Sequence, residues 1–253
     1  MFNPRFVESK SNLINNEWIN FARLHAMYFW RQNILYTRIP GAYCIDLRKT
    51  ILQANGFSEG WPDEVITSND LIFTSTLDTA WKAAKSFAVI QHPLHRLLKL
   101  PTYMAQNRDA CASLWLEKTQ LSWQDCTFKD FLMKVREDQA LMVSSHWWCA
   151  QEYCLLLRPG AYTKLFQQCQ RDDLAWWLGE QGITLIREEE DQSWEPDYSQ
   201  IPDNSPHKDT PMGALVAETL RDQSRWMECI DPEIVELSQD IYAADYALYA
   251  QAK

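Results

Sequence analysis

Apolar side chains recur at helical spacing over residues 11–33 and again over 44–55, and the β-prone run ILYTRI lies between them at 34–39. This spacing predicts two helices separated by a short buried strand. Pro40 and Gly41 end the strand, and Gly56 ends the second helix. The pattern is therefore strand, tight turn and helix.

A second unit of the same kind follows. LIFTST at 71–76 and a short helix around 77–85 lead to SFAVIQ at 86–91, an apolar run that is typical of a buried strand. Pro93 then opens a helical pattern, and proline is well suited to the first position of a helix. Alternating strands and helices predict a central parallel sheet flanked by helices, which is an α/β fold.

The rest of the chain has mostly helical patterns. The clearest predicted helices are FKDFLMKVRE (128–137), DDLAWWLGEQG (172–182) and PEIVELSQDIYAADYALYAQ (232–251). Asp231 is the predicted N-cap of the last helix, and a long acidic loop is expected over 188–210. We expect one domain over residues 1–253 with a helix-rich C-terminal half.

Composition narrows the class of protein. Hydrophobic residues make up 46% of the chain, which is enough for a sizeable core, and the net charge of −10 argues against a nucleic-acid partner. The seven cysteines include no CxxC pair and the N-terminus has no apolar leader, so we expect reduced thiols and a cytoplasmic protein. No run of about 20 apolar residues predicts a transmembrane segment, and no Cys/His spacing predicts a metal site.

Two long windows contain no acidic residue. They cover Trp18–Ile45 and Thr79–Arg108, and each contains one of the two strand–turn–helix units. A helix N-terminus offers free N–H groups and the positive end of a dipole. Two such turns suit a ligand with two separate phosphates, although buried strands and helices can also lack acidic residues for ordinary reasons. Pattern and charge therefore leave both readings open.

Five segments, in order, resemble the membrane-type carbohydrate sulfotransferase family. They are LYTRIPGAYCIDLRKTIL (35–52), KSFAVIQHPLHRLLKLPTYM (85–104), FKDFL (128–132), His146-Trp147 with Cys154, and PDNSPHKD (202–209) followed by the helix pattern 232–250. The resemblance implies a P-loop NTPase-like sulfotransferase fold. It also implies transfer of a sulfuryl group from 3′-phosphoadenosine 5′-phosphosulfate (PAPS) to a hydroxyl, for which a carbohydrate is the expected acceptor.

The resemblance also implies a set of site residues. Those expected at the donor nucleotide are Pro40, Gly41, Ala42, Tyr43 and Cys44 in the first turn, Gln91, Arg96 and Lys99 at the second, and Asn204 and Ser205 in the late loop. His146 is the expected general base, because a histidine with a pKa near neutral can accept the proton of the acceptor hydroxyl.

The chain departs from the family at the residues that contact the donor. Gly41 stands where the family has lysine, Gln91 where it has arginine and Lys99 where it has serine, and Asp46 occupies the region of small and hydroxyl residues. Removing positive charge there weakens the stabilisation of developing phosphate charge. The alternative to an enzyme is therefore a catalytically degenerate member of the same fold that acts as a binding or interaction module.

Overall fold

The computed structural model describes residues 17–42, 44–57, 75–107, 110–138, 149–187, 198, 201–203, 205–219 and 227–252. The chain divides into two compact units. Unit 1 contains residues 1–91, 151–193 and 248–253, and unit 2 contains residues 92–150 and 194–247. The single domain expected over 1–253 stays a prediction.

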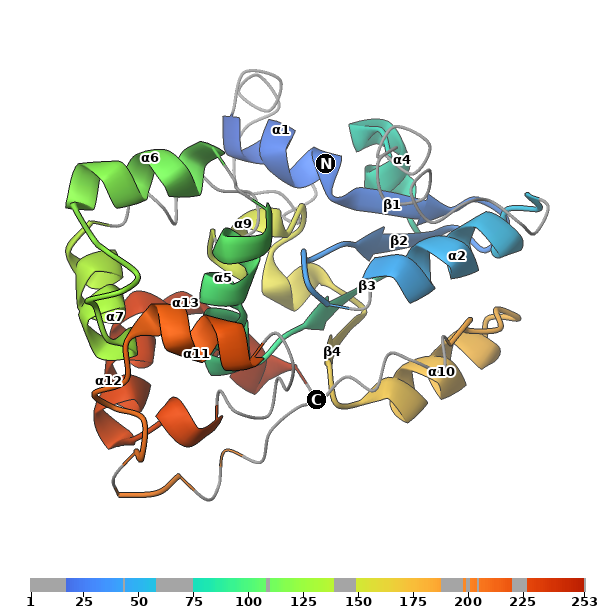
Figure 1. The fold of residues 1–253 in the computed structure, drawn as a ribbon. Helices are drawn as coiled ribbons and strands as arrows, with labels where there is room; N and C mark the ends of the chain where they lie inside the picture. The colour runs from blue at the N-terminus through green and yellow to red at the C-terminus, as the bar shows by residue number, and fades with distance from the viewer. Residues whose placement is uncertain are drawn as a thin grey trace. The chain divides into compact units, whose positions relative to one another are not determined.

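A four-stranded sheet with the order β1-β2-β3-β4 organises unit 1 (Figure 1). The strands are β1 (Ala26–Phe29), β2 (Ile34–Thr37), β3 (Lys85–Ile90) and β4 (Lys164–Gln167). β2 and β3 pair in parallel, as do β3 and β4, whereas β1 pairs with β2 in the antiparallel sense. The α/β class and the two predicted central strands are confirmed, but the sheet is mixed rather than parallel.

The antiparallel strand replaces part of a predicted helix. In the described part of the pattern 11–33, helix α1 covers Glu17–Leu24 and β1 begins two residues later. All four residues of β1 are buried, so the apolar run fits a strand as well as it fits a helix. The tight β1–β2 connection includes Asn33 at φ 57, and asparagine is one of the residues that tolerates this left-handed region.

Aromatic rings form the centre of unit 1. Tyr36 and Phe87 are paired across β2 and β3, and their rings stack at 5.0 Å. The Phe87 ring also meets Trp177 at 5.3 Å and Phe166 at 6.3 Å, both in edge contacts. Trp177 belongs to the helix that follows β4, so this cluster fixes that helix on the sheet.

Helices follow the parallel strands directly. The further helical elements of unit 1 are α2 (Cys44–Ala54), α4 (Leu77–Lys82), α9 (Gln151–Cys154), the 3-10 turn Pro159–Ala161 and α10 (Arg171–Gly179). β2 leads into α2, and β4 leads into α10. Because β2, β3 and β4 are parallel, their carboxyl ends lie at one edge of the sheet, the usual location of ligand sites in open α/β sheets.

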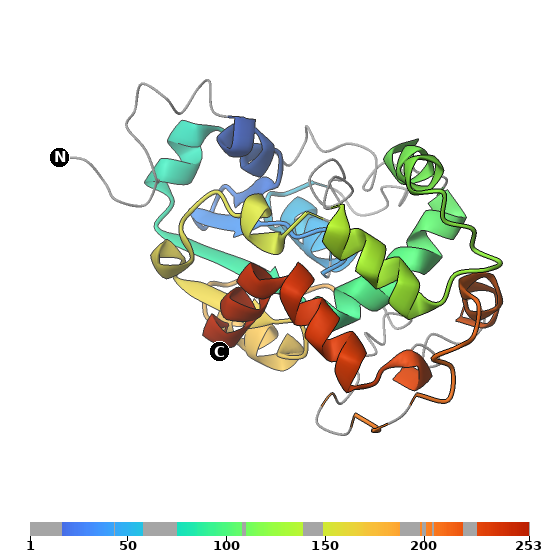
Figure 2. The same ribbon diagram turned by 90° about the vertical axis from the view of Figure 1, so that its left-hand side faces the viewer.

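Helices are the main elements of unit 2 among its described residues. Its helices are α5 (Pro93–Asn107), α6 (Ala110–Thr119), α7 (Phe128–Glu137), α11 (Met212–Thr219), α12 (Pro232–Ile241) and the start of α13 (Ala243–Gln251). α7 and α12 lie side by side (Figure 2). α7 has the predicted bounds, and Asp231 caps α12 as predicted, but the long helix expected over 232–251 is divided at Tyr242.

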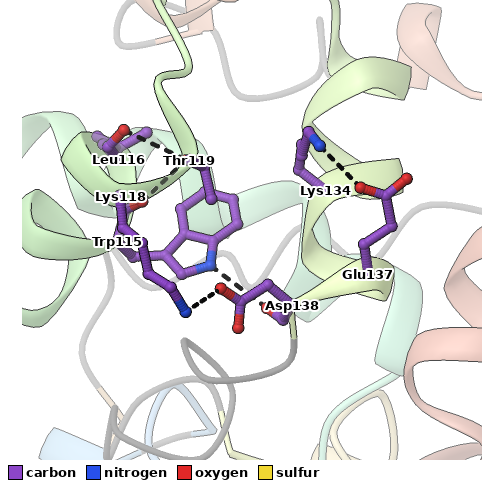
Figure 3. Close-up of polar contacts among 7 residues, drawn as sticks. All are labelled: Trp115, Leu116, Lys118, Thr119, Lys134, Glu137 and Asp138. Carbon is purple, nitrogen blue, oxygen red and sulfur yellow. Dashed lines mark hydrogen bonds and ion pairs between the residues drawn. The ribbon is translucent and has the colours of Figure 1, made fainter.

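Polar contacts fix the ends of α6 and α7. The Trp115 indole N–H donates to the backbone oxygen of Asp138, and Lys118 Nζ lies 2.7 Å from the Asp138 carboxylate (Figure 3). At the other end of α7, Thr127 and Asp130 form a reciprocal capping box. Among the residues described, no helix has the length and apolar character needed to cross a membrane.

Candidate functional site

The turn between β2 and α2 contains the residues that the resemblance assigns to the first donor-binding turn. Pro40 and Ala42 are buried, and Gly41 is exposed with φ +90. The Ala42 N–H donates to the Ile39 oxygen at 3.1 Å, and α2 begins at Cys44. Only glycine adopts this φ without strain, so a lysine at position 41 would strain the turn as it stands. Tyr43 lies outside the described residues.

Gln91 lies directly after β3 and reaches this turn. A Cβ added to Gly41 would lie 3.2 Å from Gln91 Oε1, so the Gln91 side chain packs against the glycine. Its backbone is fully engaged, because Gln91 N–H donates to Gln151 Oε1 and Gln151 Nε2 donates to the Gln91 oxygen, both at 2.9 Å. These bonds hold Gln91 in place beside the first turn.

The side-chain amide of Gln91 is buried with its hydrogen-bonding capacity only partly used. Gln91 is 1% exposed, and its Nε2 atom has no hydrogen-bond partner among the described residues. A buried donor without an acceptor costs about 1–3 kcal/mol. An acceptor atom of a ligand at the turn would remove that cost.

A guanidinium group also belongs to this edge of the sheet. Arg171, the first residue of α10, places Nη2 2.5 Å from Asp46 Oδ2 in the first turn of α2. The Asp46 side chain is 2% exposed, whereas the Arg171 side chain is 19% exposed. The ion pair is therefore open to solvent from the arginine side only.

We call Gly41, Asp46, Gln91 and Arg171, with the N-terminus of α2, the β2–α2 site; all belong to unit 1. It combines the positive end of a helix, one buried amide donor and one guanidinium that is shared with a carboxylate. Such a set suits a small oxyanion. Among the described residues, no group of three or more His, Cys, Asp or Glu side chains has the arrangement of a metal site.

Arg96 and Lys99, expected at the second phosphate, belong to helix α5 of unit 2. Arg96 is 1% exposed, with Nη1 2.6 Å from the Cys149 oxygen and 3.4 Å from Asp245 Oδ2. Lys99 is partly buried. Burial lowers the pKa of nearby His95 to about 2, and the positive charge of Lys99 contributes to that shift. Arg96 thus has a defined structural contact within its own unit.

The remaining expected residues are only partly described. Ser205 is buried, and its hydroxyl donates to the Glu228 oxygen and accepts from the His207 N–H. These bonds give Ser205 a role in shaping the loop. His146 and Asn204 lie outside the described residues, so the roles expected for them stay predictions.

Unit 2 also has a pocket of about 360 Å³ at the starts of α7 and α12. Its lining includes Asp130 and Asp231, which cap the two helices, and Glu233, which lies 2.5 Å from Lys129 Nζ. Three of the four carboxylates in its lining therefore already have partners. Gln91 Nε2 has none, which makes the β2–α2 site the better candidate.

Sequence reasoning missed Arg171 and Gln151. A signal for Arg171 exists in the run KLFQQCQR, which is a third strand–turn–helix unit with a basic residue at the first helical position. No local signal identifies Gln151, because its partner Gln91 lies 60 residues earlier. Comparison of this chain with protein-family models, curated proteins and solved structures gave no match.

Proposed function

We propose that this chain is a sulfotransferase-like protein that binds a small oxyanion-bearing ligand at the β2–α2 site and does not transfer a sulfuryl group. The observation that carries the proposal is the buried Nε2 atom of Gln91, which lacks an acceptor beside Gly41 and the start of α2. An oxyanion there would accept from this amide and face the positive end of the helix.

Two features of the site count against the transfer reaction. No lysine can stand at Gly41 without strain, so the cation that the family places at the transferred group is absent from that position. Asp46 adds a carboxylate to the first turn of α2, where it opposes a sulfate or phosphate group. The site therefore does not fit phosphosulfate in the way that the resemblance implies.

The test is a titration of the protein with inorganic phosphate and with 3′-phosphoadenosine 5′-phosphate, followed by calorimetry and thermal unfolding. We expect saturable binding, and we expect Gln91→Leu to weaken it about 10- to 100-fold, since a hydrogen bond to a charged group contributes about 1.5–3 kcal/mol. Gln53→Leu is the matched control, because Gln53 is an exposed residue of α2 in the same unit. No binding by the parent protein, or equal binding by Gln91→Leu, would overturn the proposal.

The second candidate is the enzyme itself, a PAPS-dependent sulfotransferase with His146 as base. It is favoured by the parallel pairing of β2 with β3, since both signature turns follow neighbouring strands. Incubation with labelled donor and a panel of carbohydrate acceptors tests it. If the parent protein transfers label to an acceptor and His146→Ala does not, the enzyme replaces the binding proposal.

A further inference from the structure

The Asp46–Arg171 pair has an arrangement that bears on which ligands the β2–α2 site accepts. Asp46 lies in the first turn of α2, where a helix N-terminus favours negative charge. Arg171 Nη2 contacts its carboxylate at 2.5 Å. The carboxylate therefore lies at a helix N-terminus and contacts a guanidinium, as an oxyanion ligand of this site would.

The two ends of the pair differ in their access to solvent. The Asp46 side chain is 2% exposed, and its helix is fixed nearby because Thr50 Oγ1 donates to the Asp46 backbone oxygen and accepts from the Ile186 N–H. The Arg171 side chain is 19% exposed. A ligand can thus approach the guanidinium without moving α2, while Asp46 stays where it is.

We propose that Arg171 is the anion-binding cation of the β2–α2 site and that Asp46 is its internal competitor, which restricts the site to ligands able to share or take over the guanidinium. The inference rests on the proposed function and adds the residues that set its specificity. A guanidinium has five N–H donors in a planar fork, so it can contact a carboxylate and an oxyanion together. The carboxylate lowers affinity for every anion by repulsion and by occupying donors.

The experiment measures the affinity for inorganic phosphate in the full chain by calorimetry. Asp46→Asn keeps the size of the side chain and removes its charge, so we expect phosphate affinity to rise about tenfold. Arg171→Ala is expected to reduce affinity about tenfold or more, with partial rescue in Arg171→Lys, which restores charge but not the fork. Arg187→Ala is the control, since Arg187 is an exposed arginine of unit 1 paired with Asp172.

The outcomes separate this inference from the function on which it rests. If the parent protein binds phosphate, Gln91→Leu weakens it and folded Asp46→Asn binds no more tightly than the parent, the inference is wrong and the proposed function stands. If neither the parent nor Asp46→Asn binds phosphate, both are wrong. Should Asp46→Asn fail to fold, Asp46→Ser answers the same question, because it also removes the Asp46 carboxylate from the Arg171 guanidinium.

Discussion

Two buried ion pairs, one in each unit, differ in a way that separates structure from recognition. In unit 2, Arg96 and Asp245 have side chains 2% and 0% exposed, and Arg96 also contacts the Cys149 oxygen and lies 5.8 Å from the centre of the Tyr242 ring. In unit 1, Asp46 is 2% exposed but Arg171 is 19% exposed. Only the second pair leaves its cation within reach of solvent.

This difference in solvent exposure indicates which of the two arginines can bind a ligand. A fully buried arginine that exchanged its carboxylate for a ligand would leave that carboxylate uncompensated, and breaking such a pair costs about 3–5 kcal/mol. The Arg171 guanidinium is partly exposed, so it can contact a ligand while it keeps its contact with Asp46. Arg96 therefore stabilises unit 2, whereas Arg171 can also contact a ligand.

The largest expected effect is at the fully buried pair. Asp245→Ala should lower the free energy of unfolding by about 3–5 kcal/mol, because it leaves the Arg96 guanidinium charged and buried. Chemical denaturation followed by circular dichroism measures it. Asp240→Ala is the control, since Asp240 pairs with Arg136 at the surface, and it should change stability by less than about 0.5 kcal/mol. Equal effects at both positions would remove the distinction between the pairs.

The two ends of the Asp46–Arg171 pair should respond unequally. Arg171→Ala removes the guanidinium from a buried carboxylate and should cost about 2–3 kcal/mol, whereas Asp46→Asn leaves a guanidinium that water can reach and should cost about 1 kcal/mol or less. Denaturation curves of the two variants in phosphate-free buffer give the comparison. A larger loss for Asp46→Asn than for Arg171→Ala would contradict the accessibility that we assign to the arginine.

The smallest expected effect lies at an exposed helix end. The hydrogen bond from the Thr127 hydroxyl is the main cause that lowers the pKa of Asp130, so this contact stabilises the fold above the ordinary carboxyl pKa of about 3.9 and is lost as pH falls below it. Thr127→Ala should cost about 1 kcal/mol at pH 7. The difference from the parent protein should narrow as pH falls below about 4.

Thr119→Ala provides the control for that pH series. Thr119 donates to the backbone oxygens of Trp115 and Leu116 and to no carboxylate that the structure records (Figure 3). Its stability difference should stay constant over the same pH range. A constant difference for Thr127→Ala as well would show that Asp130 is not coupled to the cap.

Local patterns predicted the elements better than the partners. The spacing of apolar residues predicted the bounds of α7, and Asp231 was predicted as an N-cap. The start of β2 was predicted correctly, but the strand ends at Thr37, two residues before the predicted end. The four-residue strands β1 and β4 were not predicted, because a short buried apolar run fits a helix and a strand equally well. The mixed sheet follows from the first of these omissions.

Part of the candidate site could be anticipated, and part could not. Gly41 and Gln91 were expected at the site from the resemblance to the sulfotransferase family, and the Gln91 side chain lies against Gly41 in the structure. Arg171 and Asp46 are 125 residues apart, and Arg96 and Asp245 are 149 residues apart. Sequence spacing carries no information on such pairs, so the partner that decides whether an arginine is free for a ligand was visible only in the structure.

The division of the chain between its units has a consequence for biosynthesis. Unit 1 takes in residues 248–253, where Leu248 and Ala252 are buried and the Tyr249 oxygen accepts from Gln167 Nε2 of β4. The sheet begins with residues that leave the ribosome early, yet its last packing contacts come from residues made more than 200 positions later. The Gln167–Tyr249 contact joins residues that are 82 positions apart, and contacts between residues distant in sequence form slowly. Unit 1 therefore lacks these contacts until all of unit 2 has been translated.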